Sequence, residues 1–250
     1  MIDLQLEKQV AIVTGASRGL GQATALALLE QGVKVLAAAR SLDELKAMEK
    51  SAPGEFLAVQ CDMKNVDAVA GLPAQAIDAF GRLDIVVNNA GIAPAGFFLK
   101  QSDEVWDDVM AVNVKAPAVL ARAAGRYMVE QGSGKIINIA STSGILGKAM
   151  LVAYSTSKGA ILQFTKALAA EWATKGVQVN AIAPGAFETD AQKAVLESPD
   201  ILKRRLGKIP VRRMGDTGEI GPLICYLASP VSNFVTGSVF VIDGGESCKL

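Results

Sequence analysis

Short apolar runs rich in valine, isoleucine and alanine recur along the chain and alternate with longer stretches in which apolar residues follow a helical spacing. Most of these runs are continuously apolar, which is typical of strands buried on both faces of a parallel sheet that helices cover. The expected strands are 10–14, 33–39, 56–60, 83–88, 135–140, 177–182 and 238–242. The expected helices include 19–31, 65–80, 102–130, 153–175 and 217–228. This alternation predicts an α/β fold with a doubly wound, seven-stranded parallel sheet and helices on both faces.

The chain length fits one domain over residues 1–250, with no repeat or linker that would divide it. One stretch, 188–216, is polar and charged with scattered apolar residues, and it interrupts the alternation between the last two expected strands. It is either a mobile substrate lid or a helical excursion on the surface.

Charge and composition exclude several classes of function. The 25 basic and 25 acidic residues cancel, which gives no reason to expect nucleic acid or an anionic membrane as a partner. No apolar stretch approaches the ~20 residues that span a bilayer, and the N-terminus lacks the features of a secretion signal. The three cysteines show no C-x-x-C pairing, so a cytoplasmic protein is expected. The absence of histidine excludes Ser-His-Asp hydrolysis and His-based zinc sites, and no metal is expected.

A glycine-rich turn follows the first expected strand and opens the first expected helix. Its sequence runs from Thr14 to Gly21 as TGASRGLG, with the spacing G-x-x-x-G-x-G. Glycines allow a pyrophosphate to approach the backbone, and the helix N-terminus supplies free N–H groups for it. The strand-turn-helix context therefore predicts a dinucleotide site of Rossmann type, although such a turn can also need glycine for its geometry alone.

The second expected strand ends in Ala39-Arg40-Ser41, where an acidic residue would bind the ribose 2′-hydroxyl of NAD. Arg40 stands there instead, and Arg18 projects from the glycine turn toward the same end. Two guanidinium groups suit a 2′-phosphate, so NADP(H) is expected in preference to NAD(H). Alternatively, both arginines cover sheet ends and either cofactor is accepted.

Five motifs occur in order along the chain: the glycine turn, Asn88-Asn89-Ala90-Gly91, Ser141 after the fifth strand, Tyr154-Ser155-Thr156-Ser157-Lys158, and Pro184-Gly185. With them the chain resembles the short-chain dehydrogenase/reductase family from about Lys8 to Gly245. Within that family it is similar to the branches of 3-oxoacyl-carrier-protein reductases and gluconate 5-dehydrogenases. The resemblance implies an NADP(H)-dependent oxidoreductase that moves a hydride between nicotinamide and a ketone or secondary alcohol.

Tyr154 and Lys158 stand four residues apart in an expected helix, so both side chains share one face. A free tyrosine has a pKa near ~10. A lysine ammonium one turn away, joined by the positive charge of oxidised nicotinamide, favours the phenolate and lowers that pKa toward neutral pH. Tyr154 is therefore expected to act as the acid/base. By resemblance, Lys158 also donates to the nicotinamide ribose.

Ser141 lies at the carboxyl end of a strand, where open α/β sheets bind ligands, and its hydroxyl is expected to hold the substrate oxygen. Thr142 and Ser143 compete for this role, but Ser141 matches the N-x-x-S pattern of the family.

Pro117 has no N–H and removes the helical partner of the Asn113 carbonyl, which is then free to bind water. The resemblance implies that this asparagine holds a water molecule in a proton relay from Lys158 to solvent. The alternative is a kinked helix that takes no part in proton transfer.

The resemblance completes the catalytic and cofactor sets. The catalytic set is Ser141, Tyr154, Lys158 and Asn113. The cofactor set is Gly15, Ser17, Arg18, Gly19, Leu20, Gly21, Arg40, Ser41, Asp62, Met63, Asn89, Ala90, Gly91, Tyr154, Lys158, Pro184, Gly185, Phe187 and Thr189. Asp62 and Met63 match positions at the adenine, whereas the Phe187 backbone and the Thr189 side chain match positions at the nicotinamide carboxamide.

The expected substrate wall is mostly apolar and comprises Ile92, Ala93, Pro94, Phe97, Ser143, Ile145, Leu146 and the segment 188–216. It favours a 3-oxoacyl chain or another hydrophobic ketone over a sugar acid or polyol. A dinucleotide-binding sensor without catalysis is the alternative class, but all four catalytic residues are present. Long apolar helices and the last strand lead us to expect a homotetramer, with a dimer as the second choice.

Overall fold

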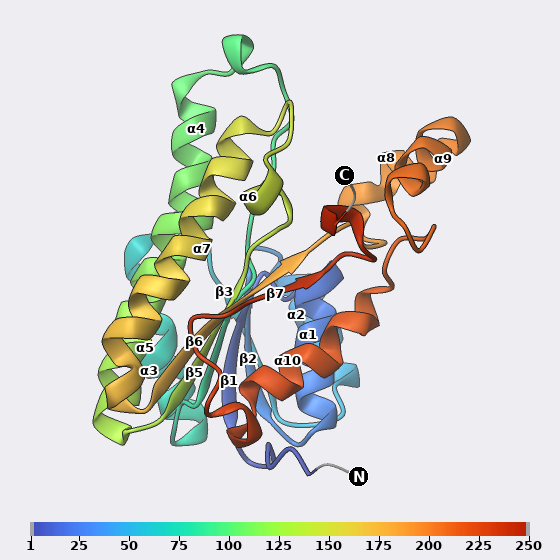
Figure 1. Ribbon diagram of the computed structural model, residues 1–250. Helices are drawn as coiled ribbons and strands as arrows, with labels where there is room; N and C mark the ends of the chain where they lie inside the picture. Colours follow the sequence, from blue (N-terminus) through green and yellow to red (C-terminus); the bar gives the residue numbers. More distant parts are fainter. Residues whose placement is uncertain (1–2, 249–250) are drawn as a thin grey trace.

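The apolar runs form one parallel sheet in the computed structural model, which describes residues 3–248 (Figure 1). Its strands are β1 (Val10–Thr14), β2 (Lys34–Ala39), β3 (Phe56–Gln60), β4 (Ile85–Asn88), β5 (Gly134–Ile139), β6 (Val177–Pro184) and β7 (Val239–Ile242). Their order is β3-β2-β1-β4-β5-β6-β7, and every neighbouring pair is parallel. The predicted doubly wound, Rossmann-type sheet is confirmed, with strand bounds shifted by no more than two residues.

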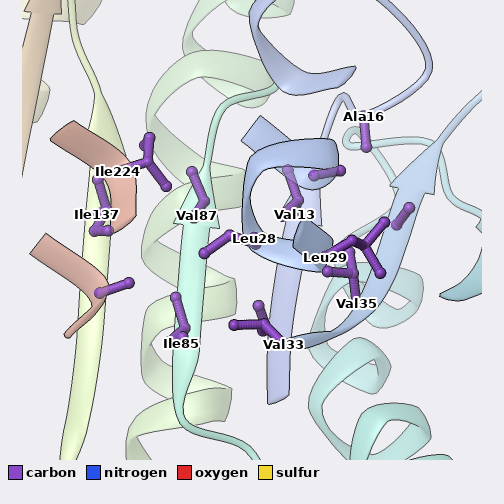
Figure 2. Close-up of a cluster of buried hydrophobic side chains, with 14 of the residues drawn as sticks. Val13, Ala16, Leu28, Leu29, Val33, Val35, Ile85, Val87, Ile137 and Ile224 are labelled. Atoms are coloured by element: carbon purple, nitrogen blue, oxygen red, sulfur yellow. The ribbon is translucent and has the colours of Figure 1, made fainter. Parts of the chain in front are cut away.

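Helices cover both faces of the sheet. One face packs against α1 (Gly19–Glu30), α2 (Leu42–Ser51) and α10 (Gly221–Ala228), and the other against α3 (Val66–Phe80), α5 (Ala116–Gln131) and α7 (Val152–Trp172). Figure 2 shows the first face, where Leu28 and Leu29 of α1 meet Val13, Val35 and Val87 from three strands. Alternate residues of each strand belong to different faces, for example Val13 to this cluster and Ile12 to the opposite one. Burial on both faces explains why the strands are continuously apolar.

The predicted helix 102–130 is one helical run with a distortion. It consists of α4 (Asp103–Met110), the π-helical turn η2 (Ala111–Lys115) and α5. In the π turn the Ala116 N–H donates to the Ala111 carbonyl, five residues earlier. This wider turn directly precedes Pro117, which could not donate in a regular helix. The predicted perturbation at the proline is therefore present as a π turn.

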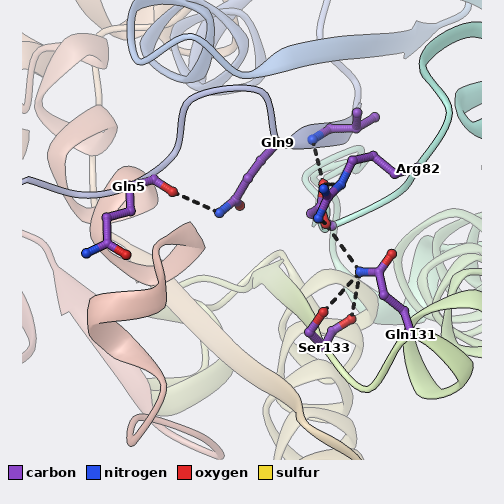
Figure 3. A network of polar contacts seen from close by, with 7 residues as sticks. Gln5, Gln9, Arg82, Gln131 and Ser133 are labelled. Atoms are coloured by element: carbon purple, nitrogen blue, oxygen red, sulfur yellow. Dashed lines mark hydrogen bonds and ion pairs between the residues drawn. The ribbon is translucent and has the colours of Figure 1, made fainter.

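The amino edge of the sheet is closed by a polar network (Figure 3). The buried carboxylate of Asp84 accepts hydrogen bonds from the Val10 N–H at 2.9 Å, from the Arg82 guanidinium at 2.8 and 2.7 Å, and from the Gln131 amide at 3.2 Å. These bonds join the start of β1 to the loop before β4 and to the end of α5. The carboxyl edge, at the opposite end of the strands, carries the loops that form the site described below.

The segment 188–216 contains the 3₁₀ turn η4 (Asp190–Gln192), α8 (Lys193–Leu196) and α9 (Pro199–Lys208). It has a small apolar cluster of its own, around Ile209 and Met214, apart from the two sheet cores. The remaining short elements are η1 (Phe98–Lys100), α6 (Ser143–Leu146), η3 (Ala173–Lys175), η5 (Thr217–Ile220), η6 (Pro230–Ser232) and η7 (Glu246–Cys248). No helix in residues 3–248 is long and apolar enough to cross a membrane.

Candidate active site

A cavity of about 490 Å³ opens at the carboxyl edge of the sheet. The loops after β1 through β6 all contribute to its wall, together with Tyr154 and Lys158 from α7. It lies where the winding of the sheet reverses, between β1 and β4, which is the usual ligand position in open α/β sheets.

The glycine turn brings its backbone close to the loop after β4. A Cβ on Gly21 would lie 2.2 Å from the Gly15 carbonyl oxygen and 2.4 Å from the Asn89 side-chain nitrogen. Gly15 and Gly19 also adopt left-handed backbone angles, with φ of 65° and 56°. The first turn of α1 has neither an acidic residue nor a side-chain cap, so its N–H groups are free for a ligand. These features fit the pyrophosphate of a dinucleotide.

Thr14 and Asn89 join the two central loops of the site. The Thr14 hydroxyl accepts hydrogen bonds from the backbone N–H groups of Asn89 and Ala90, at 3.0 and 3.1 Å. The Asn89 side chain donates to the Thr14 carbonyl at 2.8 Å. This role of Thr14 was not predicted from the sequence, although a buried threonine at the end of the first strand is a signal for such a contact.

The adenosine end of the cavity carries the expected cations. Arg18 and Arg40 both line it, both are exposed, and neither has an ion-pair partner among residues 3–248. Ser41, Asp62 and Met63 line the same end. The wall there also includes Lys64 and Asp108, which form an ion pair of 2.6 Å between the loop after β3 and α4. Sequence reasoning missed this pair because its members are 44 positions apart and belong to no motif.

Ser141 and Tyr154 meet at the inner wall of the cavity. The Ser141 hydroxyl accepts a hydrogen bond from the Ser143 N–H at 3.1 Å, and its side chain is also hydrogen-bonded to Tyr154. Burial raises the pKa of the Tyr154 phenol above its usual value, and the bond with Ser141 partly offsets that effect. The phenol is therefore protonated at neutral pH.

Lys158 lies next to Tyr154, but its ammonium group is hydrogen-bonded to a backbone carbonyl. Its ammonium nitrogen donates to the Ile139 carbonyl at 2.6 Å and lies 5.7 Å from the centroid of the Tyr154 ring. Burial lowers the pKa of Lys158 to about 8. In the protein alone, burial raises the Tyr154 pKa and the bond with Ser141 opposes it. The lowering expected from Lys158 together with oxidised nicotinamide stays a prediction for the cofactor-bound protein.

Asn113 does not line the cavity but lies directly behind its wall. Its side chain accepts from the Ile92 N–H and donates to the Ile92 carbonyl, both at 2.9 Å, and it also donates to the Ser157 hydroxyl at 3.0 Å. Ser157 in turn donates to the Tyr154 carbonyl at 2.7 Å. Asn113 thus connects the loop after β4 to the turn of α7 that carries Tyr154. This side-chain role could not be read from the proline argument, which concerned the backbone of Asn113.

Only some of the predicted residues at the end of β6 and in the loop after it line the cavity. Pro184, Gly185 and Thr189 line the cavity, whereas Phe187 is buried and its ring covers Gly215. Phe187 forms a bridge with Gly215, in which the Glu188 N–H donates to the Gly215 carbonyl and the Gly215 N–H donates to the Ala186 carbonyl. The bridge uses neither the N–H nor the carbonyl of Phe187 itself.

The structure therefore brings most of the sequence-predicted residues together in one wall. The lining residues among them are Gly15, Ser17, Arg18, Gly19, Leu20, Gly21, Arg40, Ser41, Asp62, Met63, Asn89, Ala90, Gly91, Ser141, Tyr154, Lys158, Pro184, Gly185 and Thr189. Asn113 and Phe187 stand outside this lining. Among residues 3–248 no group of three or more histidine, cysteine, aspartate or glutamate side chains could hold a metal ion.

Residues 15–247 match the family model described as enoyl-(acyl carrier protein) reductase. The chain is 39% identical over 245 residues to a 3-oxoacyl-[acyl-carrier-protein] reductase of Synechocystis sp., covering 96% of this chain and 97% of that protein. It is 38% identical over 249 residues to a 2-dehydro-3-deoxy-D-gluconate 5-dehydrogenase of Pseudoalteromonas atlantica, with 96% of each chain covered.

Among solved structures, one similar chain is a protein of Agrobacterium tumefaciens, provisionally assigned as a 2-deoxy-D-gluconate 3-dehydrogenase and crystallised with bound NADP. It superposes with a TM-score of 0.92 at 35% identity, and the match covers all of both chains.

Proposed function

The chain belongs to the short-chain dehydrogenase/reductase family of oxidoreductases, and from this premise we propose that it is an NADP(H)-dependent reductase of hydrophobic ketones. The observation that carries this proposal is the meeting of Ser141, Tyr154 and Lys158 in the wall of a cavity whose other end is a phosphate cradle. When bound, the nicotinamide cofactor supplies the hydride for reduction and accepts it in oxidation.

Tyr154 donates a proton to the carbonyl oxygen during reduction, which its protonated state at neutral pH suits. The Ser141 hydroxyl holds the same oxygen and stabilises the negative charge that develops there. Oxidation needs the phenolate of Tyr154, so its rate should rise with pH while reduction declines. Lys158 and the Asn113 region provide the route by which Tyr154 exchanges its proton with solvent.

The preference for NADP(H) rests on Arg18 and Arg40, two exposed guanidinium groups without ion-pair partners in the described part of the chain. Arg40 occupies the position at the end of β2 where an acidic residue would favour NAD(H). The NADP-bound relative from Agrobacterium tumefaciens supports the same cofactor.

The substrate preference rests on the apolar residues beside Ser141 and Gly91. Ile145, Leu146 and Phe97 are 45%, 59% and 64% exposed, so they offer apolar surface to a substrate chain. This supports a 3-oxoacyl-type or other hydrophobic ketone. A sugar-acid or polyol dehydrogenase is the second candidate, and the Pseudoalteromonas atlantica relative favours it.

NADPH oxidation with a panel of ketones, β-keto esters and 3-oxoacyl thioesters tests the reaction. Tyr154→Phe removes the proton donor and should lower kcat at least ~100-fold. Tyr127→Phe, which removes the hydroxyl of an exposed tyrosine on α5, is the matched control and should retain full activity. Equal rates for native protein and Tyr154→Phe would overturn the mechanism, and no turnover of any ketone would overturn the function.

Arg40→Ala tests the cofactor preference. Loss of a charge-assisted hydrogen bond to the 2′-phosphate should weaken NADPH binding roughly tenfold or more and leave NADH binding nearly unchanged. Lys50→Ala removes an exposed cation from neighbouring α2 and serves as the control. The two dissociation constants can be measured by fluorescence titration, and a matching loss for both cofactors would contradict the assignment of Arg40.

A homotetramer is the assembly proposed for this chain, with a dimer second. Val241 on the edge strand β7 is 44% exposed and Phe234 is fully exposed, which supports covered surfaces in an assembly. The three cysteines are free, in keeping with a cytoplasmic location. Sedimentation equilibrium decides the assembly, and a monomer at micromolar concentration would contradict it.

A further inference from the structure

Three cations and one carboxylate come together between the α6–α7 loop and the segment 188–216. Lys148, in the loop between α6 and α7, interacts electrostatically with Arg205 and Lys208 of α9 and with Glu246 of the C-terminal turn η7. Figure 1 shows this turn between α6 and the α8–α9 pair. The cluster therefore connects the loop that precedes the catalytic helix α7 to the segment 188–216.

Hydrogen bonds fix the Lys148 loop against the catalytic elements. The Lys148 N–H donates to the hydroxyl of Ser155, the residue after Tyr154, at 3.2 Å. Two residues on, the Met150 carbonyl accepts from the Gly96 N–H at 2.9 Å, which ties the loop to the 92–97 wall. Lys148 is exposed, and these two bonds hold its loop next to Tyr154 and to the loop after β4.

The opposite side of the cluster is also held in place. A Cβ on Gly244 would lie 2.5 Å from the Val211 side chain, so the C-terminal turn packs closely on the end of the segment 188–216. Arg205 and Glu246 form a two-pronged ion pair across this contact, with their side chains 18% and 17% exposed.

The charges of this cluster do not balance. Glu246 is engaged by Arg205, and among residues 3–248 no carboxylate lies within ion-pair distance of Lys148 or Lys208. Burial, Arg205 and Lys208 all lower the pKa of Lys148, and Glu246 only partly opposes them. An anion placed between the two lysines would relieve this repulsion and gain two charge-assisted hydrogen bonds.

We propose that Lys148 and Lys208 bind an anionic group, a carboxylate or a phosphate, at the distal end of the ketone substrate. This inference rests on the proposed function and narrows its substrate class. The apolar side chains of Ile145 and Leu146 precede Lys148 directly and are exposed. The preferred substrate is then a ketone that a short apolar chain separates from an anionic end.

Matched substrate pairs test the proposal. The carboxylate pair is 5-oxohexanoate and its methyl ester, and the phosphate pair is 4-oxopentyl phosphate and 5-hydroxypentan-2-one. Wild-type protein should show a higher kcat/KM for the anionic member of at least one pair, and the pair in which it does identifies the anion. Lys148→Gln and Lys208→Gln should each lower that kcat/KM about tenfold through KM, while the neutral member changes less than twofold.

Lys175→Gln, an exposed lysine of η3, is the control and should change neither member. All three positions are exposed, so the substitutions should leave the fold intact. Thermal unfolding of each variant checks this. Equal kcat/KM for the two members in both pairs, or an equal loss for the anionic and the neutral member in the lysine variants, would overturn the anion site.

A binding measurement separates this proposal from the reductase function. Calorimetric titration with hexanoate and with butyl phosphate reports anion binding without turnover. If no ketone is reduced, the function fails, whereas weaker binding of either anion in Lys148→Gln and Lys208→Gln still supports the site. Unchanged binding in both variants would overturn it.

Discussion

At the scale of single residues, burial controls the charge of the side chains that matter most in this protein. Lys158 and Lys135 are 5% and 6% exposed, and burial lowers the pKa of each to about 8. Both ammonium groups donate to neutral oxygen atoms, Lys158 to the Ile139 carbonyl and Lys135 to the Asn233 side chain at 2.7 Å. Only Lys158 faces the cavity, so Lys135 shows the effect of burial on stability without a part in the reaction.

Lys135 predicts a stability that rises with pH. Its pKa falls from 10.5 in the unfolded chain to about 8 in the fold, so between these values the unfolded state holds more protons. The free energy of unfolding should therefore increase from pH 8 to 10, with at most about 3 kcal/mol from this residue. Urea unfolding of wild type and Lys135→Met measures the difference.

Lys135→Met should show a flatter pH dependence than wild type, with Lys158 still contributing. Lys46→Met, an exposed lysine on α2, should keep the wild-type slope. Identical slopes in all three proteins would contradict a neutralised Lys135.

At the scale of elements, the helical run of α4, η2 and α5 contacts α7 at two places along its length. The π turn before α5 carries Asn113, whose side chain holds Ile92 and, through Ser157, the Tyr154 turn of α7. Further along, α5 and α7 approach closely. A Cβ on Gly125 of α5 would lie 2.2 Å from the Trp172 ring at the end of α7.

Gly125→Ala should therefore destabilise the protein by about 1–3 kcal/mol, because the added methyl overpacks a rigid indole. Trp172 reports the change directly, through a shift of its fluorescence in the folded state. Gly71→Ala is the matched control in α3, where only the end of the Gln75 side chain lies within 4 Å. That variant should gain up to about 1 kcal/mol from the helix preference of alanine. Equal stability of the two variants would contradict the close packing of α5 on α7.

At the scale of the whole molecule, different kinds of contact hold the two edges of the sheet. The Asp84 network binds the amino edge, whereas the carboxyl edge carries the cavity and the segment 188–216. A second hollow of about 630 Å³ separates that segment from α1. The segment is thus held by its own small apolar cluster and by the Arg205–Glu246 pair.

Limited trypsin digestion should first cleave in the segment 188–216, where Lys203 and Arg204 are exposed. Glu246→Gln removes the ion pair of Arg205 and should speed this cleavage several-fold with little change in Tm. Glu197→Gln, which alters an exposed pair with Lys193 in the same segment, should not. First cleavage in α5 or α7 would contradict local mobility of the segment.

The same assay distinguishes a lid from a surface excursion. NADP+ together with an alcohol product should slow cleavage if the segment closes over the site. A rate unaffected by both ligands would mean that the segment does not cover it.

The sequence alone determined the strands, their parallel pairing and most of the cavity wall, because continuous apolar runs mark buried strands and the motifs lie directly after them. Helical spacing placed Tyr154 and Lys158 together. The position of Arg40 at the end of β2 assigned it to the cofactor. Tertiary structure decided the rest. The raised Tyr154 pKa depends on burial, the Asn113–Ile92 bonds and the Lys64–Asp108 pair join distant positions, and Lys148 meets α9 only in the folded chain. Local pattern specifies a residue's direction within its element, whereas desolvation and long-range contacts exist only after the elements pack.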